Sequence, residues 1–189
     1  LDSASAFPIA NADATIQGVD VDVVWAATDN TTIRGNIQFL DSTYDELVLI
    51  SDPGRGRFGC ASLGVTDGVE SYDCSGKSLL YSPDFGADLS INHIIELANH
   101  ELSLTGNVSH RSEQQTNFLF LEETKADSYT TLNLDATLLS ADGRWAFSAF
   151  IRNATDERYL TNTNVSNRGL AYGVYSPPQT YGLRVSAAF

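Results

Sequence analysis

The sequence contains no methionine, only two cysteines, and 11 basic residues against 24 acidic ones. A net charge of −13 argues against the basic surface that nucleic-acid binding requires, so nucleic acid is not expected as a partner. No stretch approaches about 18 consecutive apolar residues, which excludes a transmembrane helix. The missing initiator methionine and the absence of a signal-peptide pattern indicate either a piece of a longer chain or a processed protein.

The two cysteines, Cys60 and Cys74, lie in the polar stretch "CASLGVTDGVESYDC". Two thiols this close together in a Gly-, Ser- and Asp-rich segment predict a disulfide formed in an oxidising compartment. A pair of free thiols in a cytosolic loop is the alternative. A structural zinc site would need further His or Cys residues nearby, and the segment has none, so no metal or cofactor is predicted.

Apolar and polar residues alternate with a period of two along almost the whole chain, which predicts an all-β protein. The expected strands are about ten residues or longer, the length at which a tilted strand crosses a bilayer. These seven strands span residues 15–27, 32–42, 84–98, 101–111, 129–139, 144–153 and 180–189.

Short and long connections between these strands alternate strictly. Tight turns are expected at residues 28–30, 99–100 and 140–143, the last with the Asp-Gly signal of a type I′ turn. Long polar segments occupy residues 43–83, 112–128 and 154–179. This order is typical of an antiparallel outer-membrane β-barrel with short periplasmic turns and long extracellular loops, and not of a β-sandwich.

The two faces of the predicted strands differ in charge. Only Asp41, next to a long loop, places a charge on the apolar face. The opposite face carries twelve charged residues: Asp20, Asp22, Arg34, Asp84, Asp88, Glu96, Glu101, Arg111, Asp135, Arg144, Arg152 and Arg184. A lipid-facing wall requires such a separation, because a lysine or arginine at the bilayer midplane costs about 2–4 kcal/mol.

Aromatic residues favour an outward direction for the apolar face. Trp25, Trp145 and Phe189 lie on it next to short turns or the chain end, as in an interfacial girdle. His93 shares that face well inside its strand and does not fit the pattern. A soluble barrel with an apolar interior would show the same alternation, so it stays an alternative.

Two stretches, "IRNATDERYLTN" (151–162) and "SPPQTYGLRVSAAF" (176–189), resemble the end of TonB-dependent outer-membrane receptors. A third, "DCSGKSLLYSPDFGADLS" (73–90), resembles the descent from a long loop into the next strand of such receptors. Ala154 and Gln179 depart from the residues usual in the family. The residues that match the family's pattern are Asn153, Asp156, Tyr159, Pro178, Thr180, Tyr181, Gly182 and Phe189.

The resemblance, which extends from about residue 14 onward, implies a barrel of 22 strands around an N-terminal plug. Residues 1–189 would then form its last third, without the plug and the TonB-contacting segment. The implied function is active transport across the outer membrane of a Gram-negative bacterium, with no enzymatic activity. Such a receptor binds a ferric siderophore or similar metal chelate and is energised through the TonB complex.

The resemblance also gives the final strand a role. Its outward residues Tyr181, Leu183, Val185 and Phe189 would form the signal read by the outer-membrane assembly machinery. The strand would pair with the first strand of the barrel, because lipid leaves no sheet edge unsatisfied.

Candidate ligand contacts lie in the long segments. Arg55 and Arg57 would suit an anionic chelate, and the aromatic residues Tyr72, Phe118 and Tyr172 would line a vestibule. The two arginines belong to "GRGRFG", which has the Gly-x-Gly-x-x-Gly spacing of a dinucleotide site. That site requires a preceding strand and a following helix, and neither is expected in this loop.

Two other function classes are alternatives. A soluble β-barrel would bind a small molecule in its interior and would not need detergent. An outer-membrane hydrolase would use Ser109, His110 or Ser112 near the external rim. Adjacent residues of a strand point to opposite faces, so Ser109 and His110 are not expected to converge.

Overall fold

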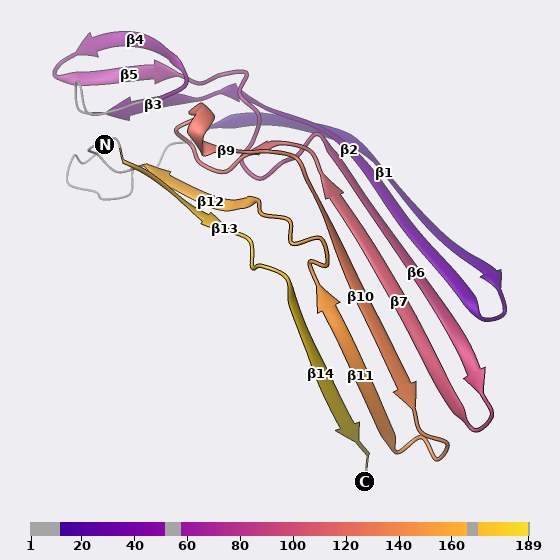
Figure 1. The fold of residues 1–189 in the computed structure, drawn as a ribbon. Helices are drawn as coiled ribbons and strands as arrows, with labels where there is room; N and C mark the ends of the chain where they lie inside the picture. The colour runs from indigo at the N-terminus through magenta and orange to yellow at the C-terminus, as the bar shows by residue number, and fades with distance from the viewer. Residues whose placement is uncertain (1–11, 52–57, 166–169, 189) are drawn as a thin grey trace.

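A computed structural model of the chain describes residues 12–51, 58–165 and 170–188. Its main element is a seven-stranded sheet in the order β1-β2-β6-β7-β10-β11-β14, in which every neighbouring pair is antiparallel (Figure 1). Each predicted strand is present. Their bounds are β1 Asp13–Thr28, β2 Thr31–Glu46, β6 Phe85–Leu97, β7 His100–Arg111, β10 Tyr129–Leu139, β11 Trp145–Arg152 and β14 Thr180–Ala187. Within the described ranges, no helix has the length and apolar character needed to cross a membrane.

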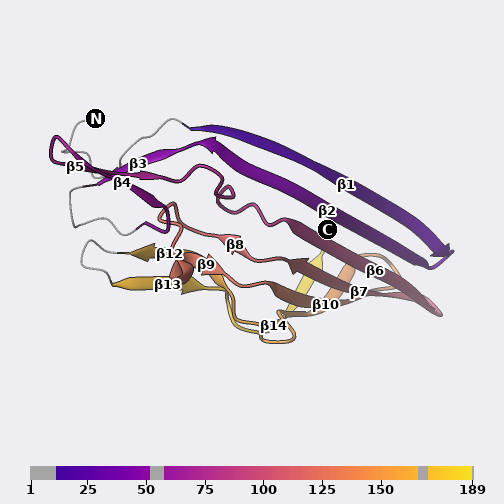
Figure 2. The same cartoon turned by 90° about the horizontal axis from the view of Figure 1, so that it is seen from above.

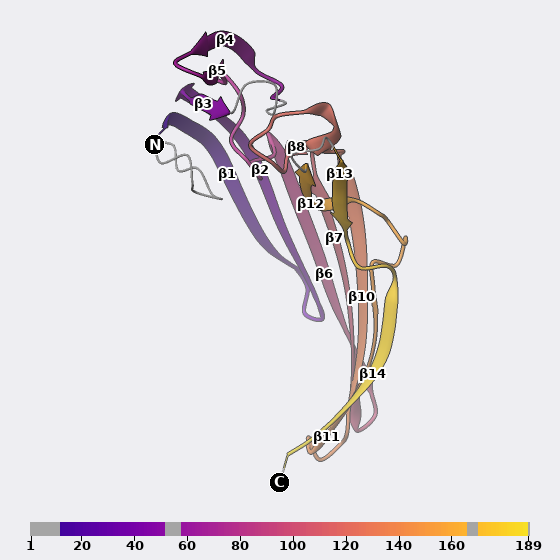
Figure 3. The same ribbon diagram turned by 90° about the vertical axis from the view of Figure 1, so that its left-hand side faces the viewer.

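The predicted alternation of short and long connections is confirmed. The tight turns gather at one end of the sheet and the long connections at the other (Figure 1). The strands are strongly tilted and the sheet curves without closing, so β1 and β14 form two free edges (Figures 2 and 3).

The long connections, expected only as polar segments, contain strands of their own. The first holds β3 Val48–Ser51, β4 Ala61–Thr66 and β5 Val69–Asp73, which form a small sheet in the order β3-β5-β4. The second holds β8 Gln114–Gln115, the 3-10 turn η1 Glu122–Thr124 and β9 Lys125–Ala126, and the third holds β12 Leu160–Val165 and β13 Ala171–Tyr175. The prediction of a type I′ turn at Asp142-Gly143 is wrong, because only Gly143 has a positive φ there. The Asp-Gly pair of the β4–β5 turn, Asp67 and Gly68, does adopt the two positive φ values of a type I′ turn.

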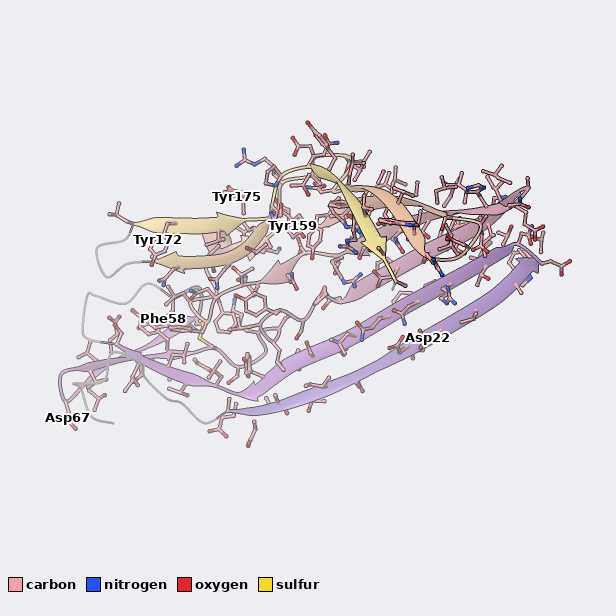
Figure 4. The ribbon with its side chains drawn as sticks, turned by 90° about the horizontal axis from the view of Figure 1, so that it is seen from below. Asp22, Phe58, Asp67, Tyr159, Tyr172 and Tyr175 are labelled. Atoms are coloured by element: carbon pink, nitrogen blue, oxygen red, sulfur yellow. A yellow bond between two sulfur atoms is a disulfide. The ribbon has the colours of Figure 1, made fainter. Side chains whose placement is uncertain are left out.

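The apolar face of the large sheet has no covering layer in the described part of the chain. Leu134, Ile151 and Leu183 are 40%, 37% and 85% exposed, whereas a soluble barrel would seal them in its interior. Seen from below, nitrogen-bearing side chains gather between β2 and β14, on the inner side of the curve (Figure 4). The curvature therefore matches a membrane barrel with an apolar wall and a polar lumen.

Polar side chains on the inner face bind one another across strands. Arg152 donates two hydrogen bonds to Asp135 at 2.6 and 2.7 Å. Arg111 donates to one oxygen of Asp88 at 2.9 Å, and the Ser109 hydroxyl donates to the other at 2.5 Å. These pairs satisfy much of the charge on the central strands of the lumen wall.

The two residues that did not fit the charge pattern have partners at the borders of the apolar band. Asp41 accepts a hydrogen bond from the Gln17 side chain at 3.1 Å, toward the loop end of β1 and β2. His93 Nδ1 lies 2.8 Å from the Thr31 hydroxyl. Since Thr31 is the first residue of β2, His93 lies at the level of a short turn although it is four residues inside β6.

Aromatic rings occur at both ends of the apolar band. Trp25 and Trp145 lie near the short turns as predicted, whereas Phe189 is outside the described residues. A second group at the loop end was not predicted: Phe39 and Phe85 pair across β2 and β6 with ring centroids 5.1 Å apart. Rings at both levels are the arrangement expected at two membrane interfaces.

Candidate functional site

The three long connections form the candidate functional site, and we name them loop A (residues 47–84), loop B (112–128) and loop C (153–179). Loop A has its own hydrophobic core, in which Leu47, Tyr72 and Cys74 are buried together with Phe120 of loop B. The predicted disulfide is confirmed, because Cys60 and Cys74 are bonded within this core. The disulfide joins the start of β4 to the end of β5 and thereby fixes the small sheet.

Tyr72 was predicted as a ligand contact, but its side chain packs inside loop A. Only 7% of Tyr72 is exposed, and its ring lies 4.7 Å from that of Phe58. Burial, together with the neighbouring Glu70, raises the pKa of the Tyr72 hydroxyl. The position of this ring favours a packing role over contact with a ligand.

Loop B packs tightly against loop A. Phe120 is 4% exposed, and its ring packs edge-on against that of Tyr44, near the end of β2, with centroids 6.1 Å apart. The Gly59 amide donates to the Leu119 carbonyl at 2.8 Å, and a Cβ atom at position 59 would overlap the backbone of Phe120. The last glycine of "GRGRFG" therefore permits close approach of two loops, and the described part of that stretch forms no phosphate-binding turn.

Loop B also binds loop C. The hydroxyls of Thr116 and Thr163 lie 2.6 Å apart, and both residues are buried. The Asn117 side chain donates to the Thr163 carbonyl at 2.9 Å. A further bond joins loops A and B, because the Tyr81 amide of loop A donates to the Gln115 carbonyl of loop B at 2.9 Å. The three loops thus form one packed unit, which we call the loop platform.

The residues that match the family pattern in loop C hold the end of β11 to the start of β14. Asn153 is 8% exposed, and its amide donates to the carbonyls of Glu157 and Pro177 at 2.9 and 3.2 Å. Its side-chain oxygen accepts from the Glu157 amide at 2.9 Å. Asp156 accepts from the Gln179 amide at 2.8 Å, which ties the far end of the loop to its beginning.

Backbone conformation explains why asparagine and aspartate occupy these two positions. Asn153 and Asp156 have φ values of 50° and 52°. Asn and Asp adopt this left-handed region more readily than other non-glycine residues. Side-chain chemistry and backbone preference therefore agree at both positions.

Two further signature residues pack against aromatic rings. Tyr159 stacks face to face on Tyr129, with centroids 3.6 Å apart. Gly182 lies under the ring of Phe150, whose Cζ would be 2.6 Å from a Cβ atom at that position. A side chain at position 182 would therefore have to displace this ring.

The exposed aromatic residues of the platform provide surface for a ligand. Phe118 is 45% exposed, and Tyr172 and Tyr175 on β13 are 59% and 51% exposed (Figure 4). The predicted contacts Phe118 and Tyr172 are therefore accessible, while Arg55 and Arg57 lie outside the described residues. Tyr175 is not one of the predicted contacts. Because Tyr172 and Tyr175 are three residues apart on one strand, they point to opposite faces.

The described charges of the platform are mostly carboxylates with local partners. Lys125 pairs with Glu113 at 2.6 Å, which raises the pKa of its ammonium group. Hydrogen bonds from Ser75 lower the pKa of Asp73. Among the residues with described positions, no group of three or more His, Cys, Asp or Glu is placed to hold a metal ion.

Two of the hydrolase candidates, Ser109 and His110, do not converge, and the Ser112 hydroxyl accepts a hydrogen bond from the Phe85 amide at 3.1 Å. The Ser109 hydroxyl binds Asp88 on the inner face, whereas His110 Nδ1 lies 2.8 Å from Thr130 on the outer face. A large hollow of about 1040 Å³ lies on the outer apolar wall between β6 and β14, away from the loops. Ile91, Leu104, Leu134, Ile151 and Leu183 line it, which is the surface that a barrel presents to lipid.

Known proteins resemble the chain in structure but not detectably in sequence. No family model and no curated protein matches the sequence. The ferric yersiniabactin uptake receptor FyuA of Yersinia pestis superimposes on 94% of the chain with a TM-score of 0.70 and 16% identity. The siderophore receptor PiuA of Acinetobacter baumannii matches 93% of it (TM-score 0.69, 14% identity), and the ferric preacinetobactin receptor BauA of the same species 94% (0.66, 18%).

These likenesses establish the fold. The chain covers 24%, 22% and 22% of the three receptor chains, so it spans about a quarter of their length. The predicted fold class, an all-β antiparallel barrel segment, is confirmed, because the chain has the fold of part of these receptor chains. All three neighbours are described as receptors, and FyuA as an uptake receptor.

Proposed function

We propose that this chain is the C-terminal barrel segment of an outer-membrane receptor that imports a scarce ligand, a ferric siderophore or similar metal chelate. The observation that carries the proposal is the sheet itself, which shares its fold with three siderophore receptors. Active uptake would draw energy from the TonB complex through a part of the protein outside this sequence. Lipid of a Gram-negative outer membrane would cover the apolar wall.

Strand direction supports a larger barrel. Both edge strands, β1 and β14, run from the loop end to the turn end. Copies of this chain joined β14 to β1 would pair these strands in parallel, so an antiparallel barrel needs an odd number of further strands. A 22-stranded barrel around a plug meets this requirement, and we propose that the same protein supplies both the strands and the plug.

The proposed ligand surface is the loop platform, with Phe118 and Tyr172 as contacts and Arg55 and Arg57 as candidates near an anionic chelate. The proposed assembly signal is the outward row of β14, namely Tyr181, Leu183 and Val185, continued by Phe189. Tyr181 and Leu183 are more than four-fifths exposed, which leaves them available to another protein or to lipid.

Uptake of radiolabelled iron tests the proposal. Cells lacking the full-length gene would be supplied with a panel of ferric siderophores, including ferric yersiniabactin and ferric preacinetobactin. We expect the gene to restore uptake of at least one chelate, and the double variant Phe118→Ala/Tyr172→Ala to reduce it. Val65→Ala, an equally exposed loop A residue, serves as the control.

A negative result has a defined meaning. Uptake that does not depend on the gene for any chelate, or that continues without TonB, would contradict the proposal. Fractionation adds a separate check, because the receptor should pellet with outer membranes and require detergent for release. A protein that stays soluble without detergent would favour the soluble barrel instead.

A further inference from the structure

We infer that loop B sets the position of the β12–β13 hairpin relative to the disulfide-bonded loop A, with Thr116, Asn117 and Phe120 as positioning residues. The hairpin carries Tyr172, one of the exposed aromatic residues of the platform. The mechanical coupling stands on the contacts alone. Its consequence for ligand affinity rests on the proposed function.

Phe120 is the residue of loop B whose side chain enters the core of loop A. Its side chain completes a core with Cys74, Tyr72 and Leu47, so the disulfide and this ring share one cluster. The backbone of Phe120 has φ 52°, and its amide closes a tight turn by donating to the Asn117 carbonyl at 3.2 Å. Residues 117–120 therefore form a short, internally bonded link.

Asn117 begins this link and reaches loop C. Its side-chain oxygen accepts from the Leu119 amide at 2.9 Å, and its amide group donates to the Thr163 carbonyl at 2.9 Å. One side chain thus holds the turn that ends in Phe120 and also strand β12 of the hairpin.

Thr116 gives a second connection to the same strand. Its hydroxyl donates to the Thr124 carbonyl at 2.8 Å, so its single hydrogen is already used. In the 2.6 Å contact with Thr163, the Thr163 hydroxyl must therefore be the donor. Both side chains are at most 5% exposed, which shields the bond from water.

The remaining contacts agree with this arrangement. Both strands of the hairpin touch η1, which follows the link within loop B. Tyr172 and Val174 on β13 are more than half exposed. Loop B therefore reaches the hairpin chiefly through Thr163 of β12 and through the contacts of η1.

Hydrogen–deuterium exchange of the full-length protein in detergent tests the coupling. Phe120→Ala should accelerate exchange in β5 and also in β12–β13, by on the order of tenfold, with β6 and β7 unchanged. Phe118→Ala is the matched control, since that ring is exposed and lies two residues away. Phe120→Leu should restore protection, because it returns an apolar side chain to the core.

A second pair of variants separates coupling from general damage. Thr163→Val removes the donor to Thr116 and should accelerate exchange in β12–β13 by about fivefold. Thr161→Val, on the same strand, removes only a bond within the hairpin, to the Val174 carbonyl, and should leave loop B unchanged. If Phe120→Ala also accelerates exchange in β6 and β7, the coupling is judged from the Thr163→Val variant alone.

Reduction of the disulfide completes the test. Treatment of the wild type with dithiothreitol should raise exchange in β12–β13, although the cysteines belong to loop A. Exchange that rises in loop A and stays unchanged in β12–β13, in both the reduced protein and Phe120→Ala, would overturn the inference.

Measuring chelate affinity distinguishes a failure of the inference from a failure of the proposed function. With a chelate that the wild type binds, Phe120→Ala should weaken binding and Phe120→Leu should restore it. A wild type that binds no chelate counts against the proposed function only, because the exchange results stand without any ligand.

Discussion

The direction of the apolar face can be measured with one lysine placed on either side of the barrel wall. Leu134 is the central residue of β10, 40% exposed on the apolar face, and pairs with Gly106 and Ile151. Asn107 lies one register step away on β7, on the inner face, and its side chain makes no hydrogen bond to another described residue. Leu134→Lys and Asn107→Lys therefore differ mainly in the face that receives the charge.

The expected magnitudes are far apart. A lysine at the midplane of a lipid-facing wall costs about 2–4 kcal/mol, a factor of roughly 30 to 900 in the folding equilibrium. A lysine that faces water in a lumen should lower the free energy of unfolding only by the contacts of the replaced side chain. Leu134→Ala measures that packing loss separately, so that the charge contribution is obtained by subtraction.

Urea unfolding of the full-length protein in lipid vesicles, followed by tryptophan fluorescence, gives the free energies. We expect Leu134→Lys to be less stable than Leu134→Ala by about 2 kcal/mol or more, and Asn107→Lys to lie within about 1 kcal/mol of the wild type. The reverse order, with Asn107→Lys the more damaging, would refute the outward direction of the apolar face.

Three other predictions concern the loops and the last strand. An alkylating reagent should label Cys60 and Cys74 only after reduction, and loss of the disulfide should destabilise loop A by about 3 kcal/mol in the loop-entropy account; labelling without reductant would contradict it. Asn153→Ala should cost about 1–3 kcal/mol and expose loop C to limited proteolysis, while Asn164→Ala, an exposed residue of β12, should not. Gly182→Val should lower the midpoint of thermal unfolding, since the added side chain meets the ring above it; an unchanged midpoint would show that this ring moves freely.

The large sheet could be predicted from sequence because each strand has two different environments. An apolar face and a polar face require a strict alternation of side chains, and the strand bounds match the predicted ones to within two residues at every end except that of β2. The largest error is at β2, which continues to Glu46 and not to residue 42. Beyond Phe39 the outward residues include Asp41 and Asp45, so the alternation ends before the strand does.

The interior of the loops was much less predictable. Their strands are short and lack a consistent alternation, and their packing depends on contacts between distant segments, such as Phe120 with Cys74. An aromatic residue in such a segment gives no sign of whether it is covered, which is why Tyr72 and Tyr172 received the same prediction but have opposite exposures. The residues of the family pattern were recognisable, yet the bonds that Asn153 makes could be described only from coordinates.

The pairing of Thr31 with His93 has a consequence for the diameter of the barrel that this sheet would form when closed. The β1–β2 turn stops at His93, while β6 continues to Leu97 before its own turn. The strands of a closed barrel tilt and stagger their register, and for a fixed number of strands a larger tilt gives a wider barrel. The four-residue step between these two turns is a stagger of this kind, so it would contribute to the diameter of a closed barrel.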